Sequence, residues 1–307
     1  MEDKYKYSTS QLLSFARDSY LERTSRPIYA LLFLLPFIIF YELGTIFINT
    51  NVLNQTQVRV VAFVWLQEFL EYLGLGSRFA WAAPALAVVV ILAALQLASR
   101  KRWRFWLGDI GPMAIECILL AVPLIVLSLF LSSPARPQAN ISRFDSSAAQ
   151  IQTLADRSLP LTSCSALTAE KPSAMETDTD EPKTGSLLAD IVTGIGAGIY
   201  EELVFRLILI CLLMILFQNV LQLGRKNSII LSVLVSAALF SAHHHIIYLH
   251  GQLAPAAPFN WTEFGFRTIA GIYFAVLFAV RGFGITAGTH AFYDIIATVI
   301  NAAIFQP

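Results

Sequence analysis

The stretch EELVFR, Glu201–Arg206, lies in the middle of an apolar run that extends from about Ser186 to Gln218. A run of this length is long enough to cross the ~30 Å hydrocarbon core of a bilayer as a helix. A charged side chain at that depth costs at least about 2.5 to 3.5 kcal/mol, so it is rarely kept without a partner or a function. Three charges in one short stretch therefore predict a membrane helix that carries a functional site.

The composition of the 307-residue chain is that of an integral membrane protein. Hydrophobic residues make up 56% of the chain and charged residues 14%, whereas a soluble globular domain carries about 25% charged residues. The formal net charge is zero, and the basic residues lie in short segments between apolar runs. This pattern predicts membrane lipids as surroundings and no nucleic-acid partner.

The apolar runs predict an all-α fold, a polytopic membrane helix bundle of about seven transmembrane helices plus one interfacial helix. The segment Val58–Leu75 carries two glutamates among aromatic residues, which is typical of an interfacial amphipathic helix. The expected spans are Pro27–Ile48, Ala82–Ala98, Gly111–Leu131, Ser186–Phe217, Ser228–Leu249, Phe264–Val280 and Ile285–Ile304.

Basic residues indicate how the chain is oriented in the membrane. The polar tail, residues 1–26, and the cluster Arg100–Arg104 are both expected in the cytoplasm. Both lie there only if Val58–Leu75 does not cross the bilayer. The same orientation places Arg225 and Arg281 inside, so we predict a cytoplasmic amino terminus.

A change in composition divides the chain into parts. Residues 132–184 are rich in Ser, Thr, Ala, Pro and acidic residues and have no sustained apolar period. Such a segment cannot bury enough surface to offset its ordering entropy, so we predict a flexible polar loop. The loop separates an amino-terminal membrane half, residues 27–131, from a catalytic membrane domain, residues 185–307.

The two adjacent glutamates are expected to differ in role. Residues four positions apart share a helix face, so Glu202 can pair with Arg206, while Glu201 points about 100° away from that pair. A carboxylate in a largely desolvated site can be poised as a general base. The alternative is that all three charged residues form one structural ion network that fixes helix packing.

Two further polar clusters lie in later apolar runs. Phe240 and His244 are four residues apart in one run, and His290 and Asp294 are four residues apart in the last. A carboxylate one helical turn from an imidazole can hold its tautomer and orientation. Polar clusters on three helices predict one shared site.

The positions of the two histidines along their helices conflict with a shared site. Counting about 1.5 Å per residue from the predicted inner ends places His244 roughly 24 Å deep and His290 roughly 9 Å deep. Gly282, Gly284 and Gly288 indicate that the last span starts irregularly, and helix tilt can absorb part of the difference.

The motifs, taken in order, resemble a known family. EExxxR at Glu201–Arg206, FxxxH at Phe240–His244 and HxxxN/D at His290–Asp294 resemble the CPBP family of intramembrane proteases. This family contains the type II CAAX prenyl endopeptidases and Abi-like, bacteriocin-processing enzymes of bacteria. The resemblance covers roughly Ser186–Ala303. The sequence Tyr-Glu-Leu-Gly at Tyr41–Gly44 is common in bacterial members and indicates a bacterial cytoplasmic membrane.

The resemblance implies an intramembrane endopeptidase that cleaves a lipidated or hydrophobic peptide or protein substrate, without a cofactor. It implies that Glu201 activates the attacking water and that His244 helps to position it. His290 together with Asp294 would stabilise the oxyanion of the tetrahedral intermediate. The supporting residues that it implies are Glu202, Arg206 and Phe240.

Position 294 departs from the commonest family pattern. Many members have Asn there, and an ionised Asp294 would repel an oxyanion. Either Asp294 is protonated in its apolar setting, or its role is to orient His290.

Other mechanisms and functions fit the same residues. One glutamate and two histidines also form a zinc-ligand set, so Glu201, His244 and His290 are the candidate ligands of a zinc-dependent version of the protease. His243 and His245 flank the motif histidine, are expected on other faces, and are treated as secondary. A non-proteolytic scaffold or immunity-type protein would hold a peptide in the same cavity. A transporter would use the buried groups as a proton relay, although no obvious inverted repeat supports it.

Overall fold

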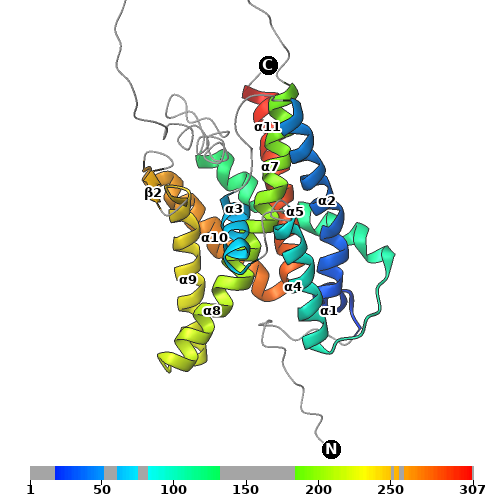
Figure 1. The fold of residues 1–307 in the computed structure, drawn as a ribbon, viewed down its shortest axis with the longest axis vertical. Helices are drawn as coiled ribbons and strands as arrows, with labels where there is room; N and C mark the ends of the chain where they lie inside the picture. The colour runs from blue at the N-terminus through cyan, green and yellow to red at the C-terminus, as the bar shows by residue number, and fades with distance from the viewer. Residues whose placement is uncertain are drawn as a thin grey trace, which may run out of the picture.

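The computed structural model describes residues 18–51, 61–74, 82–131, 184–249, 252–255 and 259–305, and these form a helical bundle (Figure 1). Its α-helices are α1 (Tyr20–Thr24), α2 (Pro27–Asn51), α3 (Val61–Tyr72), α4 (Ala83–Ser99), α5 (Ile110–Leu131), α7 (Thr184–Glu202), α8 (Ile210–Ile215), α9 (Arg225–His243), α10 (Trp261–Arg281) and α11 (Phe283–Phe305). A 3₁₀ turn, η1 (Leu107–Asp109), precedes α5, and two π-helical segments, η3 (Leu203–Leu209) and η4 (Leu216–Val220), flank α8.

The predicted all-α polytopic membrane bundle is confirmed. Six helices in the described part of the chain are long and apolar enough to cross a membrane: Pro27–Ile48, Leu107–Leu131, Leu187–Val220, Arg225–His243, Trp261–Arg281 and Phe283–Ala303. The remaining expected span corresponds to the shorter apolar helix α4, which has 17 residues. Most of the predicted tail and nearly all of the predicted polar loop lie outside the described residues.

The expected span Ser228–Leu249 is too long at its outer end. Helix α9 ends at His243, and the chain then forms strand β1 (Ile246–Leu249), which pairs antiparallel with β2 (Gln252–Pro255). Isoleucine and tyrosine in β1 favour an extended chain as readily as a buried helix, so the apolar run concealed the change. The histidine run therefore lies at the end of α9 and not inside it.

Helix α3 is a short helix that packs against the bundle with one face. Its 12 residues correspond to about 18 Å, too short to cross a bilayer, as the topology argument required. It packs against α4 and α7 through a buried face that includes Phe63, whose ring centroid lies 4.9 Å from that of Tyr200. Its position at the membrane surface stays a prediction.

The Tyr41–Gly44 motif anchors α2 to α7 just before the paired glutamates. The hydroxyl of Tyr200 donates to Oε1 of Glu42 at 3.2 Å, and the rings of Tyr41 and Tyr200 lie 5.3 Å apart. The ring of Tyr41 occupies the space that a side chain at position 196 would need. The front helix thus helps to fix the position of the segment that follows Tyr200.

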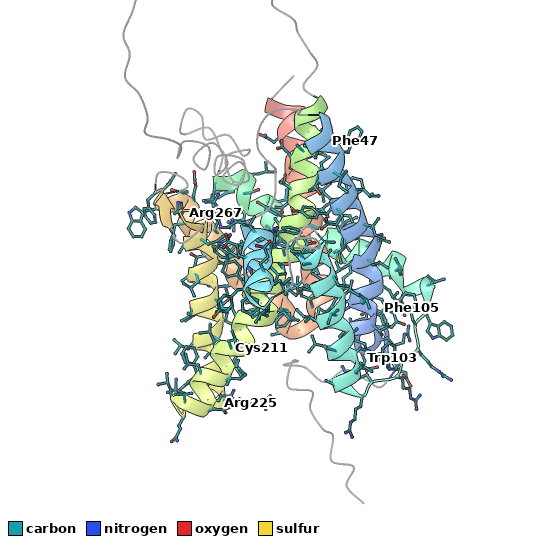
Figure 2. All side chains as sticks on the ribbon, in the orientation of Figure 1. Phe47, Trp103, Phe105, Cys211, Arg225 and Arg267 are labelled. Carbon is teal, nitrogen blue, oxygen red and sulfur yellow. The ribbon has the colours of Figure 1, made fainter. Side chains whose placement is uncertain are left out.

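A polar network joins α1, α5 and α10 at one end of the bundle. Arg281 donates from Nη2 to Oε2 of Glu116 at 2.8 Å, and the Tyr20 hydroxyl donates to the same oxygen at 2.8 Å. Burial, together with this hydrogen bond, raises the pKa of Tyr20. Arg225 and Trp103 point outward at the same end (Figure 2). Arg225, Arg281 and the segment around Trp103 therefore lie towards the same end of the bundle.

Helices α7 and α11 approach most closely at two glycines of α7. A Cβ at Gly198 would lie 2.5 Å from the backbone nitrogen of Ala291, and one at Gly194 would lie 2.7 Å from Cβ of Asp294. Small residues of this kind let membrane helices come into direct backbone contact. This contact brings the end of α7 against the middle of α11.

We predict that Gly198→Ala lowers stability by about 1 to 3 kcal/mol and impairs the site, because the added methyl group forces α11 away from α7. The measurement is thermal unfolding of the purified chain in detergent. Gly265→Ala in α10 is the matched control, since nothing lies within 4 Å of a Cβ there. Equal melting temperatures for the two variants would contradict the close-packing argument.

Candidate functional site

The EELVFR stretch begins in α7 and continues into the π-helical segment η3. Such wide turns bend helices and are frequent at functional sites, and in Figure 1 α8 leans away from the line of α7. Helix α9 supports this segment, because Ser236 donates its hydroxyl hydrogen to the carbonyl oxygen of Phe205 at 2.7 Å. The bend is therefore held by a hydrogen bond from the next helix.

Arg206 is fully buried and pairs with Glu202 as predicted. Its Nη1 lies 3.0 Å from Oε1 of Glu202. The guanidinium carbon lies 4.1 Å from the centroid of the Phe240 ring and 5.5 Å from that of Phe274, which are cation–π distances. The motif phenylalanine thus supports the arginine of another helix.

Glu202 also binds His290, which the sequence did not indicate. Nδ1 of His290 lies 2.8 Å from Oε1 of Glu202, the oxygen that also faces Arg206. On its other side, Nε2 of His290 lies 3.5 Å from Oδ2 of Asp294, and the ring stacks on Phe274 with centroids 4.5 Å apart. His290 is therefore held between two carboxylates.

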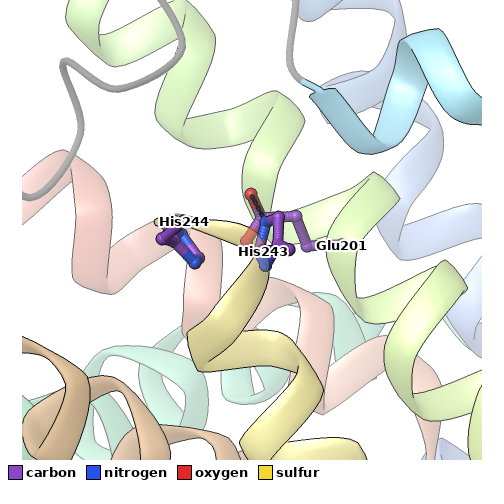
Figure 3. Close-up of side chains that lie close together, drawn as sticks. All are labelled: Glu201, His243 and His244. Atoms are coloured by element: carbon purple, nitrogen blue, oxygen red, sulfur yellow. Dashed lines mark ion pairs between the residues drawn. The ribbon is translucent and has the colours of Figure 1, made fainter. Parts of the chain in front are cut away.

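Glu201 faces the end of α9 instead. Figure 3 shows its side chain beside that of His243. Oε1 of Glu201 lies 3.6 Å from Nε2 of His243, which is longer than a hydrogen bond, and the Glu201 side chain is buried. The carbonyl oxygen of Phe240 lies 2.5 Å from Nδ1 of His243 and 2.9 Å from Nδ1 of His244. A carbonyl oxygen only accepts, so both histidines donate from Nδ1 and keep Nε2 for other partners.

The expected difference in depth between the histidines is wrong. The rings of His244 and His290 both lie near the Phe240 ring, with centroids 5.2 and 6.1 Å from it. The depth estimate assumed that the inner helix ends are level, but the hairpin of α8 and α9 extends well past the turn between α10 and α11 (Figure 1). Because the residues were counted from inner helix ends that are not level, the two histidines were wrongly predicted at different depths.

The structure brings the predicted residues of three helices into one buried cluster. Glu202, Arg206, Phe240, His290 and Asp294 are linked by the contacts above, and Glu201 and His244 join them through His243.

Sequence reasoning gave two neighbouring residues too little weight. It treated His243 as secondary, yet this histidine lies beside Glu201. A run of three histidines followed by β-branched residues was the available signal that the helix ends there and that adjacent side chains can converge. Trp65 of α3, whose ring centroid lies 5.8 Å from that of His243, had no motif to mark it.

One group in the described part of the chain has ligand atoms placed closely enough for a metal ion. It consists of Glu201, His243 and His244, whose ligand atoms lie within 4.8 Å of one another. The zinc set expected from the sequence has His290 in place of His243, but both ring nitrogens of His290 face carboxylates. Whether hydrolysis uses a metal stays a matter of prediction.

Comparison with known proteins supports the motif assignment. A family model described as type II CAAX prenyl endopeptidase Rce1-like matches residues 183–296. The match confirms the family resemblance over this part of the chain. No curated protein and no solved structure matches the chain. The matched region holds every candidate catalytic residue that the motifs indicated, and it links the buried cluster to a family of membrane proteases.

We predict that Arg206→Met destabilises the protein by about 3 to 5 kcal/mol, because it leaves the buried Glu202 carboxylate without its cation. Denaturant unfolding in detergent measures the loss. The double variant Glu202→Gln with Arg206→Met is the control and should recover part of it, since no buried charge is then stranded. A single variant as stable as the double variant would contradict this pairing.

Proposed function

We propose that the protein is an intramembrane endopeptidase that hydrolyses a peptide bond through a water activated by Glu201. The observation that carries this proposal is that the two adjacent glutamates have different partners. Glu202 is engaged by Arg206 and His290, whereas the buried carboxylate of Glu201 faces an imidazole nitrogen of His243. A carboxylate held apart from the arginine is suited to accept a proton from water.

The distances around Glu201 suit a bound water molecule. Because Oε1 of Glu201 and Nε2 of His243 are 3.6 Å apart, a water oxygen can lie about 2.8 Å from both. His244, with its Nδ1 on the same carbonyl oxygen, would help to position the water. After attack, the proton taken up by Glu201 would pass to the leaving amine.

We assign the oxyanion side of the site to His290 and Asp294. With Nδ1 of His290 on Glu202, Nε2 is the ring nitrogen that would donate to the oxyanion. Of the two roles considered for Asp294, the orienting role fits its place 3.5 Å from Nε2 of His290. The carboxylate would hold the ring in place until the substrate binds.

The proposed substrate is a peptide or protein with a lipidated or otherwise hydrophobic segment. The cluster lies among helices that are long and apolar enough to cross a membrane, and the matching family is described as prenyl endopeptidases. We propose that the protein resides in a bacterial cytoplasmic membrane with its amino terminus in the cytoplasm. The clustering of basic residues towards one end of the bundle supports this orientation.

We predict that Glu201→Gln abolishes cleavage and leaves the protein inserted and folded, because the amide keeps the shape of the carboxylate but cannot accept the proton. Mass spectrometry of candidate substrate peptides, with and without the protein, measures cleavage. Glu71→Gln on the exposed side of α3 is the matched control. Cleavage by the Glu201→Gln variant would exclude this mechanism, and a preserved cellular phenotype would favour a scaffold.

We predict that His243→Ala lowers kcat by about 10² to 10⁴, because the imidazole beside Glu201 helps to hold the water that Glu201 deprotonates. KM should change little, since the residue acts on the water and not on the substrate. His245→Ala is the control from the same histidine run, because the His245 ring packs against Phe259 and Phe264. Equal kcat values for the two variants would show that His243 has no part in the reaction.

A further inference from the structure

We infer that Glu201, His243 and His244 form a binding site for a divalent transition-metal ion of the zinc type. This inference concerns binding alone, and it goes beyond the proposed function, which uses these residues without a metal. It rests on the placement of three ligand atoms, on the groups that orient the two imidazoles, and on the burial of the site.

The three side chains are close to the spacing that a tetrahedral ion requires. Zinc lies about 2.0 to 2.1 Å from nitrogen and oxygen ligands, so two ligands of one tetrahedron are roughly 3.4 Å apart. Oε1 of Glu201 and Nε2 of His243 are 3.6 Å apart. One ligand atom from each of the three residues lies within 4.8 Å of the others, so small side-chain rotations are enough to close the set.

The backbone already orients both imidazoles as metal ligands. A histidine that binds a metal usually donates its other ring N–H to a carbonyl or carboxylate oxygen, which fixes the tautomer. The carbonyl oxygen of Phe240 accepts from Nδ1 of both His243 and His244. This carbonyl belongs to the last turn of α9, where the helix itself leaves carbonyl groups without backbone donors. Each Nε2 therefore keeps a lone pair for an ion.

The donor set and the burial select the kind of ion. Two imidazoles and one carboxylate suit zinc, cobalt or copper, whereas magnesium and calcium require oxygen ligands. Glu201 and His243 are 6% and 7% exposed, and His244 is only partly buried. Three protein ligands leave a fourth position for an exchangeable group, as in open zinc sites.

The experiment is a metal titration of the full-length chain, purified in detergent and freed of metal with a chelator. Co²⁺ is added first, because its visible absorption distinguishes four-coordinate from hydrated six-coordinate ions, and Zn²⁺ then competes with it. We expect a single high-affinity ion per chain, a four-coordinate Co²⁺ spectrum, and loss of that spectrum on addition of Zn²⁺.

Variants then locate the site. Glu201→Gln, His243→Ala and His244→Ala should each weaken binding by at least roughly tenfold. His245→Ala is the matched control and should bind as the unaltered chain does. Melting temperatures identify any variant that fails to fold. X-ray absorption of the Zn²⁺-loaded unaltered chain gives an independent count of imidazole ligands, with two expected.

Three results would overturn the inference: no binding to the unaltered chain, binding that survives all three substitutions, or a zinc spectrum without imidazole ligands. The peptidase assay is run separately in excess chelator. A chain that binds no metal in the titration but cleaves peptide would refute the metal site alone. A chain that binds metal but cleaves nothing would refute the proposed function alone.

Discussion

The cluster depends on one carboxylate oxygen, Oε1 of Glu202, which faces both Arg206 and His290. A buried charge is costly unless it is paired and hydrogen-bonded, so this oxygen requires a cation from its own helix and a donor from α11. The glycine contacts between α7 and α11 make the second partner reachable. His290 can therefore reach Glu202 only when α7 and α11 pack closely against each other.

With Glu202 engaged in this way, its neighbour Glu201 has a different partner. Adjacent residues on a helix point in different directions, and here Glu201 faces the end of α9 while Glu202 faces α11. The bend at η3 directs the chain towards α9, and Ser236 stabilises that bend. The cluster therefore lies where three helices meet: Glu201 comes from α7, His243 from the end of α9, and His290 and Asp294 from α11.

Spacing in the sequence was enough to predict the helical bundle and the pairing of Glu202 with Arg206, because both depend on local periodicity. The contact between Glu202 and His290 was not predictable, since it depends on how closely two distant helices approach. The end of α9 at His243 was missed because isoleucines in β1 extend an apolar run as well as a helix does. The depth conflict between His244 and His290 arose from the assumption of level helix ends, which only tertiary packing can test.

Phe240 serves the cluster through two chemically separate parts. Its ring lies against the Arg206 guanidinium, while its carbonyl oxygen holds both His243 and His244. Substitution removes the first contribution and leaves the second intact, because every amino acid supplies a carbonyl group. The phenylalanine in the FxxxH motif therefore reflects only the role of the side chain, and not that of the backbone carbonyl. The orientation of the histidines depends on where α9 ends, which the motif letters do not describe.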